Sequence, residues 1–263
     1  MNVDSRIVPV PRVARAAATD MKRAGEGLEF GQAGFRITRE ALRDGSMLAR
    51  LRALGNPEIE TRSDAEIEAS LDTMLAGHPR GSDAFVFGYG SLMWNPAFLF
   101  AARQLGTLHG WHRQFCLGMP FGRGTPERPG LMMALDSGGS CHGIVFRIAA
   151  AQVRDELLLI WRREMAGTVY RARWVNVRTA EGVVRAVTFV INRAHPRYIG
   201  TMEQGAIAEI LAHAEGQLGS CAAYLEQTMH ALQALGVTDR SLERLAVEVA
   251  RRRMPQQEQA SGM

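Results

Sequence analysis

The spacing of hydrophobic and polar positions divides the chain into a helical beginning, a strand-rich middle and a helical end. From Thr38 the apolar residues recur at helical spacing, and Ser63 with Glu66 forms a capping-box pattern that predicts a second helix. From Ala84 short apolar runs between Gly and Pro clusters predict strands. These runs are AFVF, QLGTLHGWHRQFCL, GLMMALD and CHGIVFRI, then, after a helix at about 150–165, TVYRARWVNV and VVRAVTFVI.

The last third of the chain is predicted to be helical. Thr201 with Gln204 resembles a capping box, and Thr238 or Asp239 is expected to start a final helix that ends in a run of arginines. Strands with one inserted helix, and helices gathered at both ends, indicate an α+β fold with a curled or closed sheet. We expect a loosely ordered leader, a helical extension, a main domain with its C-terminal helices, and a flexible tail, at residues 1–35, 36–80, 81–254 and 255–263.

Composition excludes several classes of protein. No apolar run approaches the roughly 20 residues needed to span a bilayer, and no signal-peptide pattern is visible, so we expect a cytoplasmic protein without a membrane partner. The formal charge of +4 is mild for 263 residues and does not indicate a nucleic-acid partner. Three scattered cysteines predict buried thiols, and Lys22, the single lysine, excludes lysine chemistry from the main domain. The oligomeric state stays open.

The run VFGYGSLMWNP begins like a dinucleotide-binding fingerprint. Gly88 and Gly90 give G-x-G after a strand, but Met93 occupies the sixth position and WNP turns away from a helix, so that interpretation fails. A nucleophile elbow around Ser91 fails because Tyr89 and Met93 replace its glycines. Two possibilities remain: an ordinary glycine turn, or a backbone cradle for an anion or carboxylate.

Glu164 lies where the helical pattern predicts a core residue. The helix at about 150–165 has an apolar stripe that extends onto Glu164 and consists of Val153, Leu157, Ile160 and Trp161. A buried glutamate needs either a cation or a chemical role. Arg113, Arg171 and Arg173 are available for a structural ion pair. In the functional alternative, burial raises the pKa of the carboxyl and makes it a general acid or base.

Taken together, the loop and the glutamate resemble the ChaC family, the glutathione-specific γ-glutamylcyclotransferases. VFGYGSLMWNP resembles the family's signature loop, GWHRQFCL and GRGTPERPG resemble two further blocks, and LIWRREM resembles the catalytic helix. The likeness runs from about Thr38 to Arg253. It implies a small mixed β-barrel with flanking N- and C-terminal helices, so that residues 81–254 would form the cyclotransferase domain.

The resemblance also implies roles for individual residues. Glu164 matches the general acid/base, Tyr198 matches a tyrosine that reaches the substrate, and Arg123 is a plausible contact for the rest of the peptide. The loop that holds the γ-glutamyl group corresponds to Gly88, Tyr89, Gly90, Ser91, Leu92 and Met93. Whether its backbone N–H groups bind the substrate carboxylate or the developing oxyanion is left open. No metal or cofactor is implied.

The implied enzyme is a carbon–nitrogen lyase that cleaves glutathione to 5-oxoproline and Cys-Gly. In this reaction the α-amine attacks the γ-carbonyl of the same molecule. Two alternatives remain: a cyclotransferase for other γ-glutamyl amines or dipeptides, and a non-catalytic binding or regulatory protein on the same scaffold.

Overall fold

A closed five-stranded β-barrel forms the centre of the computed structural model, which describes residues 37–53 and 60–254. The strands follow the order β1-β3-β2-β4-β5, and β1 closes the barrel by pairing in parallel with β5 at Val86 and Val187. The strands are β1 (Ala84–Gly88), β2 (Ala102–Met119), β3 (Gly130–Ile148), β4 (Tyr170–Thr179) and β5 (Gly182–Ile191). The predicted α+β fold with a closed sheet is confirmed. The expected leader and tail lie outside the described residues.

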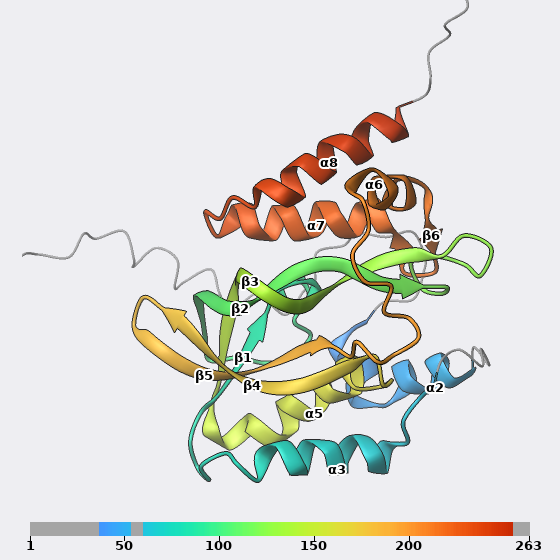
Figure 1. Cartoon of the computed structure of the whole chain (residues 1–263). Coiled ribbons are helices and arrows are strands. Elements are labelled where there is room, and N and C mark those ends of the chain that lie inside the picture. The colour runs from blue at the N-terminus through green and yellow to red at the C-terminus, as the bar shows by residue number, and fades with distance from the viewer. Residues whose placement is uncertain (1–36, 54–59, 255–263) are drawn as a thin grey trace, which may run out of the picture. The chain divides into compact units, whose positions relative to one another are not determined.

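The longest strands, β2 and β3, form an extended antiparallel pair (Figure 1). The sequence predicted two strands, GLMMALD and CHGIVFRI, where the structure has the single strand β3. The glycines between them, Gly138 and Gly139, have positive φ values of 102° and 67°. Opposite them the register shifts between His109 and Trp111. An irregularity of this kind bends a strand without ending it, which is why the glycine cluster did not mark a boundary.

Helices from the N-terminal half and the middle of the chain cover one side of the barrel (Figure 1). Thr38 and the Ser63–Glu66 capping box start helices as predicted, but Gly45, with φ of 78°, divides the first helical run in two. Trp161 is fully buried and packs edge-on against Phe189 of β5, at 5.3 Å between ring centroids. The elements are α1 (Arg39–Arg43), α2 (Ser46–Ala53), α3 (Asp64–Leu75), the 3₁₀ turn η3 (Ala150–Gln152) and α5 (Val153–Glu164).

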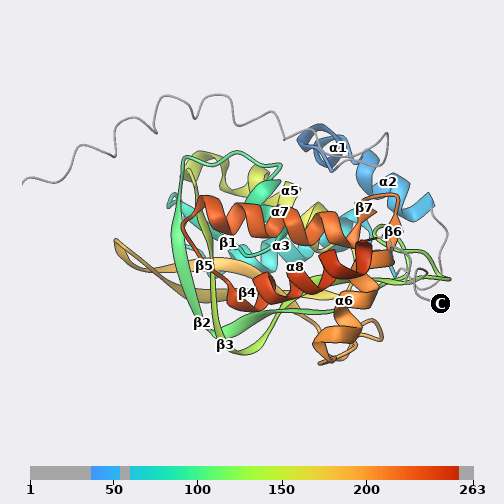
Figure 2. The same ribbon diagram turned by 90° about the horizontal axis from the view of Figure 1, so that it is seen from above.

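The C-terminal helices cover the opposite side, where α7 and α8 lie side by side (Figures 1 and 2). Asp239 caps the last helix as predicted. The expected capping box at Thr201 is wrong: the helix begins at Gln204, and Glu203 precedes it without a side-chain cap. The elements are α6 (Gln204–His213), the short strands β6 (Glu215–Gly216) and β7 (Gly219–Ser220), α7 (Cys221–Ala234) and α8 (Arg240–Arg253).

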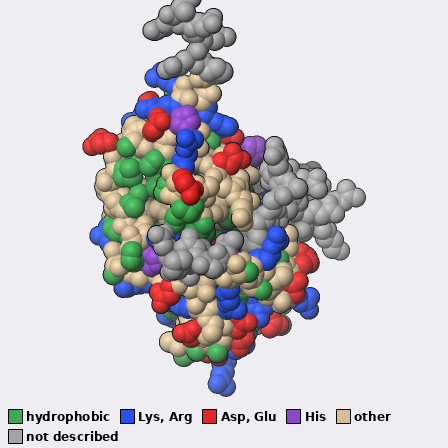
Figure 3. Space-filling view, turned by 90° about the vertical axis from the view of Figure 1, so that its right-hand side faces the viewer, with side chains coloured by type: hydrophobic (Ala, Val, Ile, Leu, Met, Phe, Trp, Pro, Cys, Tyr) green, Lys and Arg blue, Asp and Glu red, His purple; other side chains and the backbone are tan. Residues whose placement is uncertain are grey.

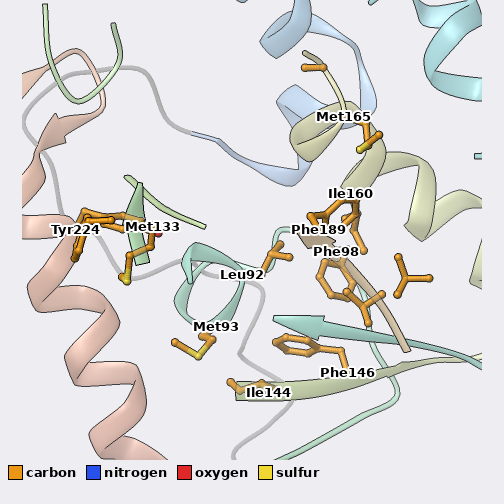
Figure 4. Close-up of a cluster of buried hydrophobic side chains, with 14 of the residues drawn as sticks. Leu92, Met93, Phe98, Met133, Ile144, Phe146, Ile160, Met165, Phe189 and Tyr224 are labelled. Carbon is orange, nitrogen blue, oxygen red and sulfur yellow. The ribbon is translucent and has the colours of Figure 1, made fainter. Parts of the chain in front are cut away.

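Two apolar clusters hold these layers together. One draws on all five strands and no helix, and so fills the barrel; it includes Phe87, Leu135 and Val190. The larger cluster joins the outside of the barrel to α3, α5 and α7 (Figure 4). All three cysteines are buried and free, as predicted. In the described part of the chain no helix is long and apolar enough to cross a membrane. Acidic and basic side chains are interspersed on the face shown in Figure 3.

Candidate active site

The glycine loop follows β1 directly and leads into one helical turn, α4 (Ser91–Trp94). The sequence indicated that the chain turns away from a helix here; in the structure a single turn forms and ends at Asn95, whose backbone is no longer helical. The N–H groups of the first helical residues have no partner inside a helix, so those of Ser91 and Leu92 are available to a ligand. A β-carbon on Gly90 would lie 2.9 Å from the Tyr224 hydroxyl oxygen, so only glycine is accommodated under this tyrosine.

Two predicted loop residues, Leu92 and Met93, turn their side chains into the core (Figure 4). Leu92 packs in the cluster that contains Ile160 and Phe189. Gly88 is equally constrained, because a β-carbon there would lie 3.0 Å from that of Leu92. These residues therefore anchor the loop, and their contact with a ligand is limited to the backbone.

Glu164 is the last residue of α5, and its side chain is 14% exposed. The predicted stripe is correct, since the four apolar residues that precede it on this face are buried. Burial raises the pKa of the Glu164 carboxyl, and the neighbouring positive charge of Arg163 opposes the rise. A largely buried carboxyl with a raised pKa is suited to accepting and returning a proton.

The cation beside Glu164 is Arg163, which the sequence did not single out. Its Nε lies 3.0 Å from Glu164 Oε1, and its side chain is 4% exposed. The same guanidinium donates from Nη2 to the Ser91 hydroxyl at 2.7 Å and from Nη1 to the Asn95 carbonyl. Adjacent helical residues point in different directions, so periodicity gave no signal for this pair.

The three arginines proposed from the sequence as partners of Glu164 lie elsewhere. Arg113 donates to the Tyr89 carbonyl at 2.6 Å and pairs with Asp239 at 3.1 Å. Arg171 and Arg173 are exposed on β4. The ion pair considered for Glu164 is formed with Arg163, and a second buried carboxylate of the same helix, Glu156, pairs with Arg39.

Three tyrosines, the buried Tyr89 and Tyr224 and the partly buried Tyr170, lie within electrostatic range of the Glu164 carboxyl, which raises the pKa of each. Burial is the main cause that raises their pKa values, to about 12 for Tyr224. Tyr89 donates to the Phe189 carbonyl at 2.9 Å, and Tyr170 donates to the Met133 carbonyl at 3.4 Å. These phenols therefore remain protonated, and two of their hydroxyls are held by backbone carbonyls. Tyr170 and Tyr224 were not identified from the sequence.

The other two predicted site residues differ in placement. Arg123 lies 5.0 Å from the centre of the Tyr224 ring, so it belongs to the same surroundings as Glu164. Tyr198 instead donates its hydroxyl to Asp136 at 2.8 Å, and Arg193 binds the other oxygen of that carboxylate. Its contact with the substrate stays a prediction.

Comparison with known proteins identifies the family. The family model described as ChaC-like protein matches residues 84–252. The glutathione-specific γ-glutamylcyclotransferase of Escherichia coli (strain K12) is 41% identical over 182 residues, which cover 69% of this chain and 79% of that protein. Glutathione-specific γ-glutamylcyclotransferase 1 of Danio rerio is 30% identical over 55% of this chain and 76% of that protein.

Solved structures agree on the fold. A yeast γ-glutamylcyclotransferase specific to glutathione, labelled with selenomethionine, superimposes with a TM-score of 0.60 at 21% identity, covering 65% of this chain and 97% of that one. A second structure of the yeast protein gives a TM-score of 0.56 at 21% identity, covering 66% of this chain and all of that one. With the family model covering most of the barrel and its C-terminal helices, the chain belongs to the ChaC-like protein family.

Proposed function

We propose that this protein is a γ-glutamylcyclotransferase that cleaves glutathione to 5-oxoproline and Cys-Gly. The observation that carries the proposal is the position of Glu164, a largely buried carboxyl with a raised pKa, joined through Arg163 to the glycine loop. The relatives in Escherichia coli and Danio rerio carry the name of this activity. A cytoplasmic location, as expected from the sequence, remains part of the proposal.

In the proposed reaction the α-amine nitrogen of the γ-glutamyl group attacks its own γ-carbonyl carbon. A five-membered ring closes, and the bond between the γ-carbonyl carbon and the cysteine nitrogen breaks. The attacking amine has an ordinary pKa near 8, so a base must remove its proton. Glu164 accepts that proton and returns one to the departing nitrogen, which becomes the free amine of Cys-Gly. All atoms of the substrate appear in the two products.

Two physical effects supply the rate. Proton transfer by a positioned carboxyl contributes roughly 10²- to 10⁴-fold. Holding the amine against the carbonyl contributes about 7 to 11 kcal/mol of the barrier, because the attack is intramolecular. In our proposal the backbone of Gly90 to Leu92 and the Ser91 hydroxyl hold the γ-glutamyl group, and Arg163 orients both this hydroxyl and the base.

The decisive test gives the purified protein glutathione alone and quantifies 5-oxoproline and Cys-Gly by mass spectrometry. Wild type should release the two products in equal amounts, and Glu164→Gln should release neither while its circular dichroism spectrum stays unchanged. Asp155→Asn, an exposed carboxylate on the same helix, is the matched control and should keep full activity. Product release by Glu164→Gln at the wild-type rate would reject Glu164 as the base. Wild type that releases 5-oxoproline only from other γ-glutamyl compounds would favour the related activity.

A further inference from the structure

Arg123, in the segment between β2 and β3, is a buried cation that has no counter-ion among the described residues. The residue is 8% exposed. A guanidinium carries five N–H donors, yet among the described residues that of Arg123 makes one hydrogen bond, from Nη1 to the Ser220 carbonyl at 2.9 Å. Within residues 37–53 and 60–254 no carboxylate pairs with it. Buried charges in proteins are normally paired, so this arginine is available to a partner that the described part of the chain does not provide.

Tyr224 of α7 supports this arginine and carries an unsatisfied hydroxyl. Its ring centre lies 5.0 Å from the Arg123 guanidinium carbon, within the range of a cation–π contact. The residue is 2% exposed, and its hydroxyl has no hydrogen-bond partner in the described part of the chain. The hydroxyl oxygen lies over Gly90 of the loop. Arg123 and the loop are therefore bridged by a tyrosine whose donor is free.

The charge of the surroundings is unbalanced. Arg163 and Arg123 are both buried, and the positive charge of Arg163 lowers the pKa of Arg123, in addition to the larger effect of burial. Glu164 neutralises Arg163. One positive charge thus remains without compensation, and a bound carboxylate is the ligand that would balance it.

We propose that Arg123 and Tyr224 form a subsite for the C-terminal carboxylate of the peptide substrate, which restricts the enzyme to γ-glutamyl peptides with a free terminal acid. The inference rests on the proposed function and goes beyond it, because it assigns the determinant of substrate choice.

The connectivity of the substrate decides between its two carboxylates. The α-carboxylate is attached to the same carbon as the attacking amine, so it lies with that amine beside Glu164, Arg163 and the loop. Arg163 and Glu164 lie at the end of α5, where Arg163 also contacts the loop. Arg123 instead contacts the Tyr224 ring and the Ser220 carbonyl at the start of α7. The terminal carboxylate, several bonds from the reacting carbon, is the group that reaches Arg123.

The test compares glutathione with its C-terminal amide, which lacks only the terminal charge. For wild type we expect KM to be about 10- to 100-fold higher for the amide at similar kcat, as the loss of a charge-assisted hydrogen bond predicts. Arg123→Gln should raise KM for glutathione to the value for the amide and leave KM for the amide unchanged. Arg128→Gln, an exposed arginine in the same segment, is the matched control and should behave as wild type.

Two results would overturn the proposal: equal KM values for the acid and the amide in wild type, or an equal rise for both substrates in Arg123→Gln. Should Arg123→Gln fail to fold, Tyr224→Phe serves instead, because it keeps the ring and removes the hydroxyl. It should raise KM for glutathione several-fold and act less on the amide; equal effects would count against the subsite.

Failure of the proposed function remains distinguishable. Wild type that forms no 5-oxoproline from either peptide would reject the activity. Calorimetric titration of the Glu164→Gln protein with the two peptides then decides the subsite alone. Tighter binding of the free acid, lost when Arg123→Gln is added, would support it, and equal binding of acid and amide would overturn it.

Discussion

Arg163 Nη2 donates to the Ser91 hydroxyl at 2.7 Å and so fastens the last turn of α5 to the glycine loop. The Nε of the same guanidinium lies 3.0 Å from Glu164 Oε1. One cation therefore fixes the distance between the proposed base and the proposed substrate cradle. Because the Arg163 side chain is 4% exposed, solvent screens these contacts little.

Arg163→Lys should impair catalysis without abolishing the fold. A lysine keeps the charge but cannot donate in three directions from one plane, so the loop and the base lose their common support. We expect kcat/KM for glutathione to fall about 10- to 100-fold, in line with the loss of one or two charge-assisted hydrogen bonds. Arg154→Lys, at an exposed ion pair on the same helix, is the control. Unchanged kinetics in Arg163→Lys would remove Arg163 from the site.

The raised pKa of Glu164 gives a prediction about pH and rate. The carboxyl accepts a proton only when ionised, and burial raises its pKa above the ordinary 4.5. The acid limb of kcat should therefore lie above pH 4.5. Arg163→Met should move it further upward, since the opposing positive charge is removed. Initial rates between about pH 4 and pH 8 measure the acid limb of wild type and that of Arg163→Met. A limb that stays in place in Arg163→Met would contradict the assignment.

The same shift predicts how stability depends on pH. A raised pKa in the folded state means that folding favours the protonated carboxyl, so this stabilisation is present below pH 4.5 and is lost as pH rises through the folded-state pKa. Between pH 4.5 and the folded-state pKa of Glu164, the free energy of unfolding of wild type should therefore fall relative to that of Glu164→Gln. Each tenfold difference in proton affinity corresponds to about 1.4 kcal/mol. Urea denaturation at several pH values tests this. If the free energies of unfolding of the two proteins change with pH in parallel, the prediction is refuted.

The sequence anticipated the parts of the fold that depend on local pattern. Apolar runs between Gly and Pro clusters located every strand of the barrel, although two runs form the single strand β3, and the stripe on α5 correctly placed Glu164 among core positions. Glycine was less informative, because it can bend a helix or strand as readily as end it. The cluster around Gly138 bends β3, whereas Gly45 separates α1 from α2. Local pattern cannot distinguish these outcomes, which depend on the neighbouring strand or helix.

The contacts that complete the site depend on tertiary packing and were not accessible from the sequence. Tyr224 and Gly90 are separated in the sequence by more than half of the described residues. In the structure, however, the tyrosine hydroxyl lies against that glycine. Similarly, many arginines lie along the chain, and nothing in their spacing identifies Arg163 as the cation that joins Glu164 to Ser91. The Tyr224 contact arises only when α7 docks against the loop, and the bond from Arg163 to Ser91 only when α5 docks there.

Gly90→Ala should destabilise the protein through Tyr224. The added β-carbon would lie 2.9 Å from the tyrosine hydroxyl, closer than ordinary contacts allow. Overpacking of this kind costs about 1 to 3 kcal/mol. In a Tyr224→Phe background the hydroxyl is absent, and the cost of the alanine should fall by at least about 0.5 kcal/mol. Gly77→Ala, where the nearest atom is 4.0 Å away, is the control. Additive effects in the double variant would argue against this contact.

Arg39 should contribute to stability and not to substrate recognition. It forms two hydrogen bonds with the buried Glu156 of α5, and Glu156 also accepts from the Leu99 backbone at 2.7 Å. Arg39→Met would leave a buried carboxylate without its cation, at a cost of about 3 to 5 kcal/mol. Thermal denaturation should show the loss, while KM for glutathione remains unchanged in the folded fraction. A variant as stable as wild type would show that the helical extension is held mainly by apolar contacts.

Tyr198→Phe tests the remaining residue that the resemblance placed in the substrate site. The Tyr198 hydroxyl is engaged with Asp136 at 2.8 Å, and that carboxylate also pairs with Arg193. Since this donor is already satisfied by an ionised acceptor, we expect its removal to change KM for glutathione by less than about threefold and to cost about 1.5 to 3 kcal/mol of stability. Tyr224→Phe, measured in parallel, should show the opposite: a larger change in KM for glutathione and a smaller loss of stability. A large rise in KM with unchanged stability would mean that Tyr198 leaves Asp136 to bind the substrate.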